Sequence, residues 1–120
     1  MNQDDLKKRT KQFALDIIRF VESLPKRRTA EILGNQLLRS GTAVGANYRS
    51  ACRARSVADF ISKMGIVEEE ADESMFWMEL LIASDLVRKE DLAGLLDEAD
   101  QLAAIAVSSI RTARKSQKMK

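Results

Sequence analysis

The sequence contains no histidine, and it has one cysteine and one proline in 120 residues. Without an imidazole, the chain has no Ser-His or Cys-His nucleophile pair and no His-ligated metal site. The single Cys52 excludes an internal disulfide and a cysteine-rich zinc site, which is typical of a protein in a reducing cytoplasm. No apolar run approaches the roughly 18–20 residues of a membrane span, and the polar start MNQDDLKKRT does not resemble a signal peptide. We therefore expect a cytoplasmic protein with no membrane contact and no cofactor.

What the sequence does contain is typical of one folded domain over residues 1–120. Hydrophobic residues make up 45% of the chain and charged residues 32%, which is too apolar for a disordered chain. No strand-like alternation, hairpin turn, internal repeat or low-complexity segment is present. Apolar residues instead recur at spacings of three and four, which indicates amphipathic helices. The helices are predicted at about 4–24, 30–53, 57–87 and 90–114, followed by a basic, frayed tail over 115–120.

The predicted helix boundaries follow from the residues between the periodic stretches. Pro25, the only proline, disfavours helix at the residue before it and separates the first two helices. Thr29 is the predicted N-cap of the second helix. Ser56 is the predicted N-cap of the third helix, with Asp59 completing a capping-box pattern. Because the links are short, the sequence predicts an all-α fold, an antiparallel up-and-down four-helix bundle.

The second helix has an unusual core stripe. Its stripe residues recur at spacings of four and three: Leu33, Leu37, Ser40, Val44, Asn47 and Ala51. Gly34, Gly41 and Gly45 flank this stripe, and each glycine costs roughly 1 kcal/mol relative to alanine inside a helix. Their presence predicts that a neighbouring backbone comes close. Asn47 is predicted to be a structural polar residue of the core, because a buried amide needs partners.

The segment 75–82 of the third helix is apolar around most of its circumference. A helix that is apolar on every side must be covered on every side. A four-helix bundle of this size has few other elements to do so, and we therefore expect a subunit interface and a homo-oligomer. The residues assigned to this interface are Met75, Phe76, Trp77, Leu80 and Leu81.

The net charge of +2 hides a strong segregation of charge. Residues 1–60 hold 12 basic and 6 acidic residues, whereas residues 61–120 hold 8 and 12. One interpretation is that the two halves pair across helices, with Arg39 opposite Ala71, Asp72 and Glu73. The other is that the basic residues bind RNA or DNA phosphates. The candidate nucleic-acid-binding residues are Lys26, Arg27, Arg28, Arg49, Arg53 and Arg55.

These basic residues fall in two links, which lie at opposite ends of a bundle, so one chain does not gather them. A ring of identical subunits would repeat each patch around one rim.

Two further groups suggest chemistry, and neither predicts an enzyme. The acidic run from Glu68 to Glu73 lacks the histidines of a bundle di-metal site, and weak Mg²⁺ binding through Glu69 is the alternative to a solvated face. Cys52 lies next to Arg53, which lowers the pKa of a neighbouring thiol, but the sequence shows no general base beside it. We therefore predict no catalytic site, no metal site and no catalytic activity.

The stretch QLLRSGTAVGANY, at 36–48, followed by SVADF, at 56–60, resembles a bacterial four-helix bundle family. That family includes proteins encoded in intervening sequences of large-subunit ribosomal RNA genes and the accessory protein of diversity-generating retroelements. The resemblance runs from Phe13 through Leu24 and Pro25 to the fourth helix. It implies assembly into a homopentameric ring. In the retroelement branch, it also implies binding to nucleic acid and contact with a reverse transcriptase.

The prediction is therefore a non-catalytic, homo-oligomeric helical-bundle scaffold or adaptor whose basic links and rim bind RNA or DNA. Its expected partners are copies of itself as a pentamer, a nucleic acid, and a reverse transcriptase or other protein. The alternative is a protein–protein interaction module that binds no nucleic acid. The apolar segment 75–82, the separated basic links and the family resemblance support the first function. Phe76 and Trp77 lie in the most acidic part of the chain, which favours contact of these two residues with protein.

Overall fold

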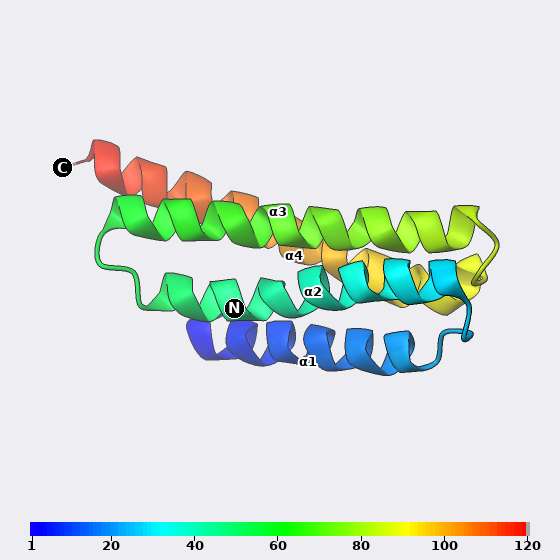
Figure 1. The fold of residues 1–120 in the computed structure, drawn as a ribbon. Helices are drawn as coiled ribbons and strands as arrows, with labels where there is room; N and C mark the ends of the chain where they lie inside the picture. Colours follow the sequence, from blue (N-terminus) through cyan, green and yellow to red (C-terminus); the bar gives the residue numbers. More distant parts are fainter. Residues whose placement is uncertain (120) are drawn as a thin grey trace.

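A computed structural model describes residues 1–119, which form four helices and no strands. The helices are α1 (Gln3–Glu22), α2 (Arg28–Cys52), α3 (Val57–Ala83) and α4 (Lys89–Lys118). They run alternately up and down, with α1 against α2, α2 against α3 and α3 against α4 (Figure 1). The predicted all-α bundle is confirmed. None of these helices has a stretch long and apolar enough to cross a membrane.

The bundle is long and narrow, with extents of 53 × 22 × 20 Å. The α1–α2 and α3–α4 links lie together at one end, and the α2–α3 link lies at the other end, beside the last turns of α4 (Figure 1). We call the end with the α2–α3 link the link-53 end, after the residues 53–56 that form it. We call the other end the link-23 end, after residues 23–27.

The predicted starts of the helices are confirmed for α3 and wrong for α2. The Ser56 side chain accepts a hydrogen bond from the Asp59 N–H at 3.0 Å. In α2, the cap position is Arg27, which has extended backbone angles and no side-chain hydrogen bond to the helix. The Arg27 carbonyl already accepts from the Glu31 N–H at 2.9 Å, so the helix has begun before Thr29. The link therefore uses backbone geometry after Pro25 in place of a capping side chain.

The ends of α3 and α4 differ from the predicted ones in opposite directions. Helix α3 stops at Ala83, earlier than the predicted residue 87, because Asp85 takes a left-handed conformation with φ of 60°. The Leu86 N–H then donates to the Leu81 carbonyl at 3.1 Å, the pattern that closes a helix in a Schellman motif. Helix α4 continues to Lys118, so the predicted frayed tail is helical through most of its length. Arginine, lysine and glutamine favour helix, and cations near a helix C-terminus are stabilised by its dipole.

The core of the bundle follows the predicted stripes in α1, α3 and α4, and it corrects the stripe in α2. The side of α2 that faces α1 carries Gly34, Gly41 and Gly45, all of them buried, and the buried side also includes Tyr48. Leu33 and Asn47, which were predicted on the core stripe, are only half-buried. The reason is the close approach of α1, which rotates the glycines inward and moves the larger side chains toward the edge.

Gly41 and Gly45 allow α1 and α2 to pack closely. A Cβ atom on Gly41 would lie 2.9 Å from Ile17 Cγ1 and 3.0 Å from Ile17 Cγ2, and one on Gly45 would lie 3.3 Å from Thr10 Oγ1. Ile17 is fully buried and β-branched, so its side chain has little room to rotate away. The prediction of a close neighbouring backbone is confirmed, and that neighbour is α1.

Asn47, which was predicted to be a structural polar residue of the core, is only half-buried, whereas Ser40 on the same predicted stripe is fully buried. Asn47 donates its amide N–H to the Ala43 carbonyl at 2.8 Å, within its own helix, so it joins no two helices. The polar layer is instead made by Ser40 of α2 and Ser74 of α3, whose hydroxyls are hydrogen-bonded at 3.0 Å. Both side chains are fully buried. No buried side-chain N or O atom in residues 1–119 lacks a hydrogen-bond partner.

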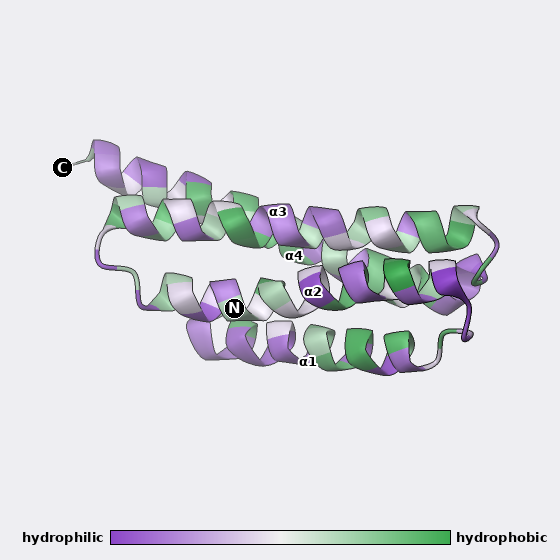
Figure 2. Ribbon diagram, in the orientation of Figure 1, coloured by the Kyte–Doolittle hydropathy of each residue, from purple (hydrophilic) through white to green (hydrophobic). Residues whose placement is uncertain are grey.

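The segment 75–82 is partly covered within one protomer. Leu81 is fully buried among core residues, so it is removed from the predicted subunit interface. Met75, Trp77 and Leu80 are half-buried, and Phe76 leaves 50% of its surface exposed. Figure 2 shows this hydrophobic segment at the end of α3. The neighbouring helices therefore cover more of the segment than the sequence predicted, and Phe76 is the large residue that they leave open.

Replacing Gly41 with alanine is expected to lower the free energy of unfolding by up to about 2 kcal/mol. Overpacking a filled core costs roughly 1–3 kcal/mol, and the helix propensity of alanine returns about 1 kcal/mol of it. The matched control is Gly65→Ala in α3, where no atom lies within 4 Å of the added Cβ. That control is expected to gain about 1 kcal/mol. Urea denaturation of both variants measures the difference, and equal stabilisation by the two alanines would contradict close α1–α2 packing.

Candidate nucleic-acid interface

The six basic residues predicted to bind nucleic acid lie in two separate places. Lys26, Arg27 and Arg28 lie at the link-23 end, and Arg49, Arg53 and Arg55 lie at the link-53 end. The bundle is 53 Å long, and the two groups lie toward its opposite ends. The expectation that one chain does not bring them together is therefore confirmed.

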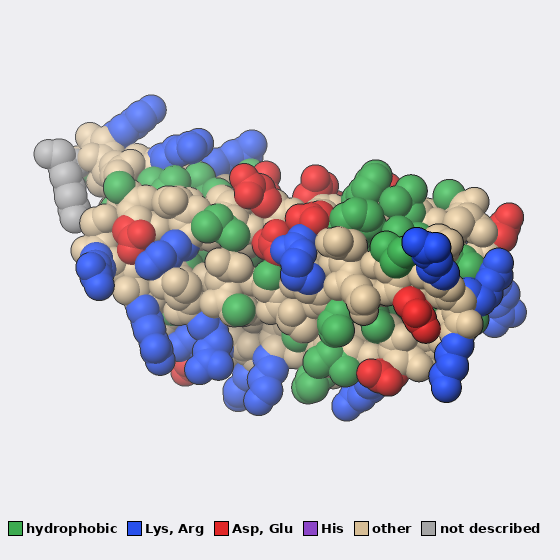
Figure 3. Space-filling view, in the orientation of Figure 1, with side chains coloured by type: hydrophobic (Ala, Val, Ile, Leu, Met, Phe, Trp, Pro, Cys, Tyr) green, Lys and Arg blue, Asp and Glu red, His purple; other side chains and the backbone are tan. Residues whose placement is uncertain are grey.

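The structure instead places Arg49 and Arg53 around one groove with lysines of α1. A groove of about 480 Å³ runs between the first half of α1 and the last half of α2. Its lining includes five cations and no carboxylate: Lys7, Lys8, Lys11, Arg49 and Arg53. We call this surface the basic groove. Figure 3 shows lysine and arginine side chains gathered on this part of the molecule, over the start of α1 and the end of α2.

Small residues give the basic groove its depth. Thr10 and Ala14 of α1 face Thr42, Gly45 and Ala46 of α2 across it. Because none of these side chains is large, the long lysine and arginine side chains stand around the groove as a rim. The same glycine that lets α1 approach α2 therefore also leaves open space above their contact.

The five cations of the basic groove have no ion-pair partner among residues 1–119. In contrast, Arg9 binds Glu98 of α4 with Nε 2.7 Å from Oε2, and Arg39 binds Glu70 and Glu73 of α3. The cations of the groove thus retain charge that neighbouring carboxylates do not neutralise. Concentrated, unpaired positive charge attracts phosphates over distances comparable with the Debye length, roughly 8–10 Å in physiological salt.

The register of α1 and α2, which the periodic pattern does not determine, brings the three lysines to the groove. Gly45 meets Thr10 and Gly41 meets Ile17, so antiparallel neighbours in α1 and α2 have numbers that sum to between 55 and 58. This register places Lys7 beside Arg49 and Lys11 beside Gly45. The prediction considered the links alone, and it missed basic residues on the faces of adjoining helices.

The alternative interpretation, pairing between basic and acidic helices, holds for Arg39. Its guanidinium lies 3.1 Å from Glu70 and also binds Glu73, whereas Asp72 is exposed and turned away. Residues 70 and 73 share a helix face that residue 72 does not. The Arg39 hydrogen bond holds the pKa of Glu73 below its ordinary value. Burial raises the pKa of Glu70 despite the attraction of Arg39.

The other groups that suggested chemistry are not assembled into a reactive site. Within residues 1–119, no three carboxylate or thiol side chains come together in a cluster that could hold a metal ion. Cys52 is half-buried near the link-53 end, where it packs against the core. Burial is the largest cause that raises the pKa of the Tyr48 phenol, and the hydrogen-bonding contact with Cys52 raises it further.

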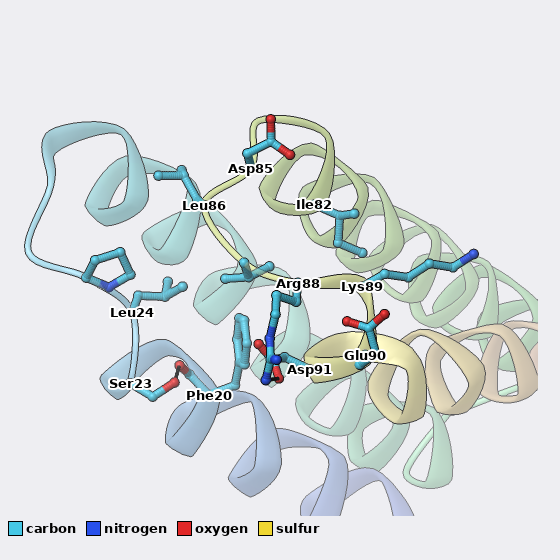
Figure 4. Close-up of a pocket in the computed structure, with 12 residues that line it drawn as sticks. Phe20, Ser23, Leu24, Ile82, Asp85, Leu86, Arg88, Lys89, Glu90 and Asp91 are labelled. Atoms are coloured by element: carbon cyan, nitrogen blue, oxygen red, sulfur yellow. Dashed lines mark hydrogen bonds and ion pairs between the residues drawn. The ribbon is translucent and has the colours of Figure 1, made fainter.

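A second pocket lies at the link-23 end (Figure 4). Its apolar part comes from Phe20 and Leu24 at the end of α1 and from Ile82 at the end of α3. Charged residues surround it, but Arg88 pairs with Asp91 at 3.4 Å. Positive and negative side chains alternate here, as Figure 3 also shows for this end of the molecule. The pocket therefore presents no excess of one charge.

Comparison with known proteins gives a matching family and similar solved structures. The family model described as 23S rRNA-intervening sequence protein matches residues 3–108. A crystal structure of a protein with unknown function from the S23 ribosomal protein family of Bacteroides thetaiotaomicron superposes with a TM-score of 0.85 at 32% identity. That match covers 92% of this chain and 99% of the other. No protein with a curated description matches the chain.

Replacing Arg39 with glutamine is expected to raise the pKa of both Glu73 and Glu70, because both carboxylates lose their cation. Glu73, whose pKa is lowered in the folded protein, stabilises the fold above its ordinary pKa. That stabilisation disappears as the pH falls through the lowered value. Glu70, whose pKa is raised, acts in the opposite sense. NMR titration of the side-chain carboxyls measures both values. Arg19→Gln on α1 is the control, and unchanged pKa values in the Arg39 variant would show that the ion pairs do not form in solution.

Proposed function

Because the chain belongs to the 23S rRNA-intervening sequence protein family, we propose that it is a non-catalytic helical-bundle scaffold that binds RNA or DNA and assembles with copies of itself. The observation that carries nucleic-acid binding is the basic groove, with five cations and no carboxylate in its lining. Lysine and arginine side chains that neutralise phosphates release condensed counterions, and this release drives binding. The similar crystal structure is described as a protein of unknown function, so the proposal rests on this chain's own surface.

The shape of the basic groove supports a polymer of phosphates better than a single small anion. Lys7 and Lys11 follow each other by one helical turn, as do Arg49 and Arg53. Two rows of cations along two antiparallel helices extend the positive surface in one direction. A repeating phosphate backbone matches such an extended array, whereas one small anion would contact part of it.

The absence of catalysis is part of the proposal. The chain has no histidine, and its one cysteine is half-buried against the core. A scaffold needs only binding surfaces, and the exposed charges and apolar residues of this bundle supply them.

Self-assembly is supported by apolar side chains that one protomer leaves open. Phe76 and Ile32 expose 50% and 51% of their surfaces, and Leu15 and Ile18 of α1 expose more than a third. Trp77 donates to Glu73 at 3.4 Å and packs edge-on against Phe76, with ring centroids 5.1 Å apart. This gives the outer face of α3 an aromatic pair for a neighbour to cover. We propose that Met75, Phe76, Trp77 and Leu80 contact another copy in a ring of five.

The alternative proposal is a protein-interaction module that binds no nucleic acid. The same exposed Phe76 favours it, since acidic residues of α3 surround this side chain and repel phosphates. In that case, a reverse transcriptase or another protein would cover the aromatic pair. Capture of a partner that survives nuclease treatment, without binding to purified RNA or DNA, favours this alternative.

The nucleic-acid proposal predicts that Lys11→Gln combined with Arg49→Gln weakens binding to RNA and duplex DNA. Each lost phosphate contact makes the plot of log K against log salt shallower by about 0.9 for B-DNA, so the slope changes by about 2. Fluorescence anisotropy at several salt concentrations measures it. The matched control is Arg19→Gln combined with Lys89→Gln, which removes the same charge from exposed side chains outside the basic groove. Equal losses from both pairs would point to net charge as the cause.

The assembly proposal predicts that the purified protein has a mass near five chains in light scattering. Phe76→Ser is expected to shift it toward smaller species, because the mutation removes the most exposed aromatic ring of α3. Thr112→Ala, on the exposed last turns of α4, is the control for an unrelated surface change. A monomer at micromolar concentration contradicts the ring.

A further inference from the structure

The last turns of α4 carry a second basic surface. Beyond Ile110, the side chains of α4 leave the core, and only Ala113 is even half-buried. Four exposed cations follow at spacings of three, one and three, which places them on one face of the helix. We call them the α4 stripe: Arg111, Arg114, Lys115 and Lys118.

The charge of the α4 stripe is not balanced. None of its four cations has an ion-pair partner within residues 1–119. No acidic residue occurs after Asp100 in the sequence. The remaining positions of these turns include Thr112, Ser116 and Gln117, which offer no apolar face. A helix that lies in a membrane surface or in a coiled coil needs such a face.

The α4 stripe and the basic groove belong to the same end of the molecule. The link that follows α2 connects them, since Arg55 shares a recess with Ala113 and Ser116 of α4. Figure 3 shows lysine and arginine side chains along the last turns of α4, and others over the start of α1 and the end of α2. The link-53 end therefore presents positive charge on two sides.

Resting on the proposed function, we propose that the ligand is a double-stranded nucleic acid, held through its phosphates by the basic groove together with the α4 stripe. The family match ends at residue 108, before the stripe begins. The stripe is thus a feature of this chain that the family model does not describe.

The lack of stacking groups favours a duplex over a single strand. Proteins that bind single strands place aromatic side chains against the bases. The lining of the basic groove consists of lysine, arginine, threonine, alanine and glycine. The aromatic residue nearest to the stripe is Phe60, which is half-buried and packs against the core. Phe76 and Trp77 lie toward the other end of α3, among carboxylates.

The charge density of the ligand leads to the same conclusion. A duplex carries a denser array of phosphates than a single strand, and each contact releases about 0.9 counterions in place of about 0.7. A surface that makes only charge contacts therefore gains more from a duplex. The groove offers none of the asparagine or glutamine side chains that recognise adenine, and in this proposal its lysines and arginines bind phosphates, where they read no base. Binding is expected to be independent of base sequence.

The test compares duplex and single-stranded probes of about 20 nucleotides, as RNA and as DNA, in salt titrations. The wild type is expected to bind duplexes about tenfold more tightly than single strands. Arg114→Gln combined with Lys115→Gln is expected to make the duplex salt slope shallower by about 2. Both side chains are exposed beyond the last buried residue, so folding is unaffected. Arg19→Gln with Lys89→Gln, at two exposed cations outside both basic surfaces, is the matched control, and light scattering checks that all variants share one oligomeric state.

Each other outcome contradicts a defined part of the proposal. Equal or tighter binding of single strands overturns the duplex. The α4 variant could keep the wild-type slope of log K against log salt for duplexes, while the Lys11 and Arg49 variant has a shallower slope. This result overturns the role of the α4 stripe and leaves the proposed function intact. Loss of binding to phosphatidylserine vesicles in the α4 variant, with its duplex slope unchanged, assigns the stripe to membranes. If no probe binds the wild type at low salt, the proposed function fails and this inference fails with it.

Discussion

The close contact between α1 and the glycine face of α2 determines the rest of the surface described above. Gly41 against Ile17 and Gly45 against Thr10 set the register of the two helices. That register aligns Lys7 and Lys11 with Arg49 and Arg53, and the small residues between them leave the basic groove open. The packing of α1 against α2 and the shape of the basic groove are thus coupled at Gly45, because a larger residue there would push the helices apart and fill the groove.

Positive and negative side chains are almost equal in number in this bundle, but they lie in different places. Its net charge is +2, which suggests no affinity for phosphates when taken alone. Arg9 and Arg39 are neutralised by carboxylates of α4 and α3, while the cations of the basic groove and the α4 stripe are not. Because salt screens charges beyond roughly 10 Å, a ligand at the link-53 end responds to the local excess and hardly to the distant acidic residues.

The apolar face and the basic end suit different partners. Phe76, Trp77 and Ile32 lie toward the link-23 end, and the unpaired cations lie at the link-53 end. One protomer therefore presents its exposed apolar residues and its unpaired cations on separate surfaces, as the proposed self-assembly and the proposed nucleic-acid binding require. From the sequence, we expected that only a ring of subunits would bring the basic residues together. In the structure, one protomer already concentrates positive charge, and assembly would add avidity by repeating the site.

Residues near one another in the chain were sufficient to predict the four helices from their periodicity, the Ser56 cap from its motif and the close approach from the glycines, and the stretches 36–48 and 56–60 carried the resemblance to the family. Contacts between helices decided the remaining features. The periodic pattern placed Leu81 on the core stripe of the third helix and also in the predicted interface, and the structure decides for the core. The pattern could not show that Phe76 is open, because this coverage depends on how α2 and α4 pack against α3. It placed Ser40 and Asn47 on one core stripe, and of these two Ser40 is the buried one, bonded across to Ser74. The basic groove depends on how α1 and α2 are rotated and aligned relative to each other. A periodic pattern shows which face of a helix is apolar, but it fixes neither the exact rotation of two helices nor their register.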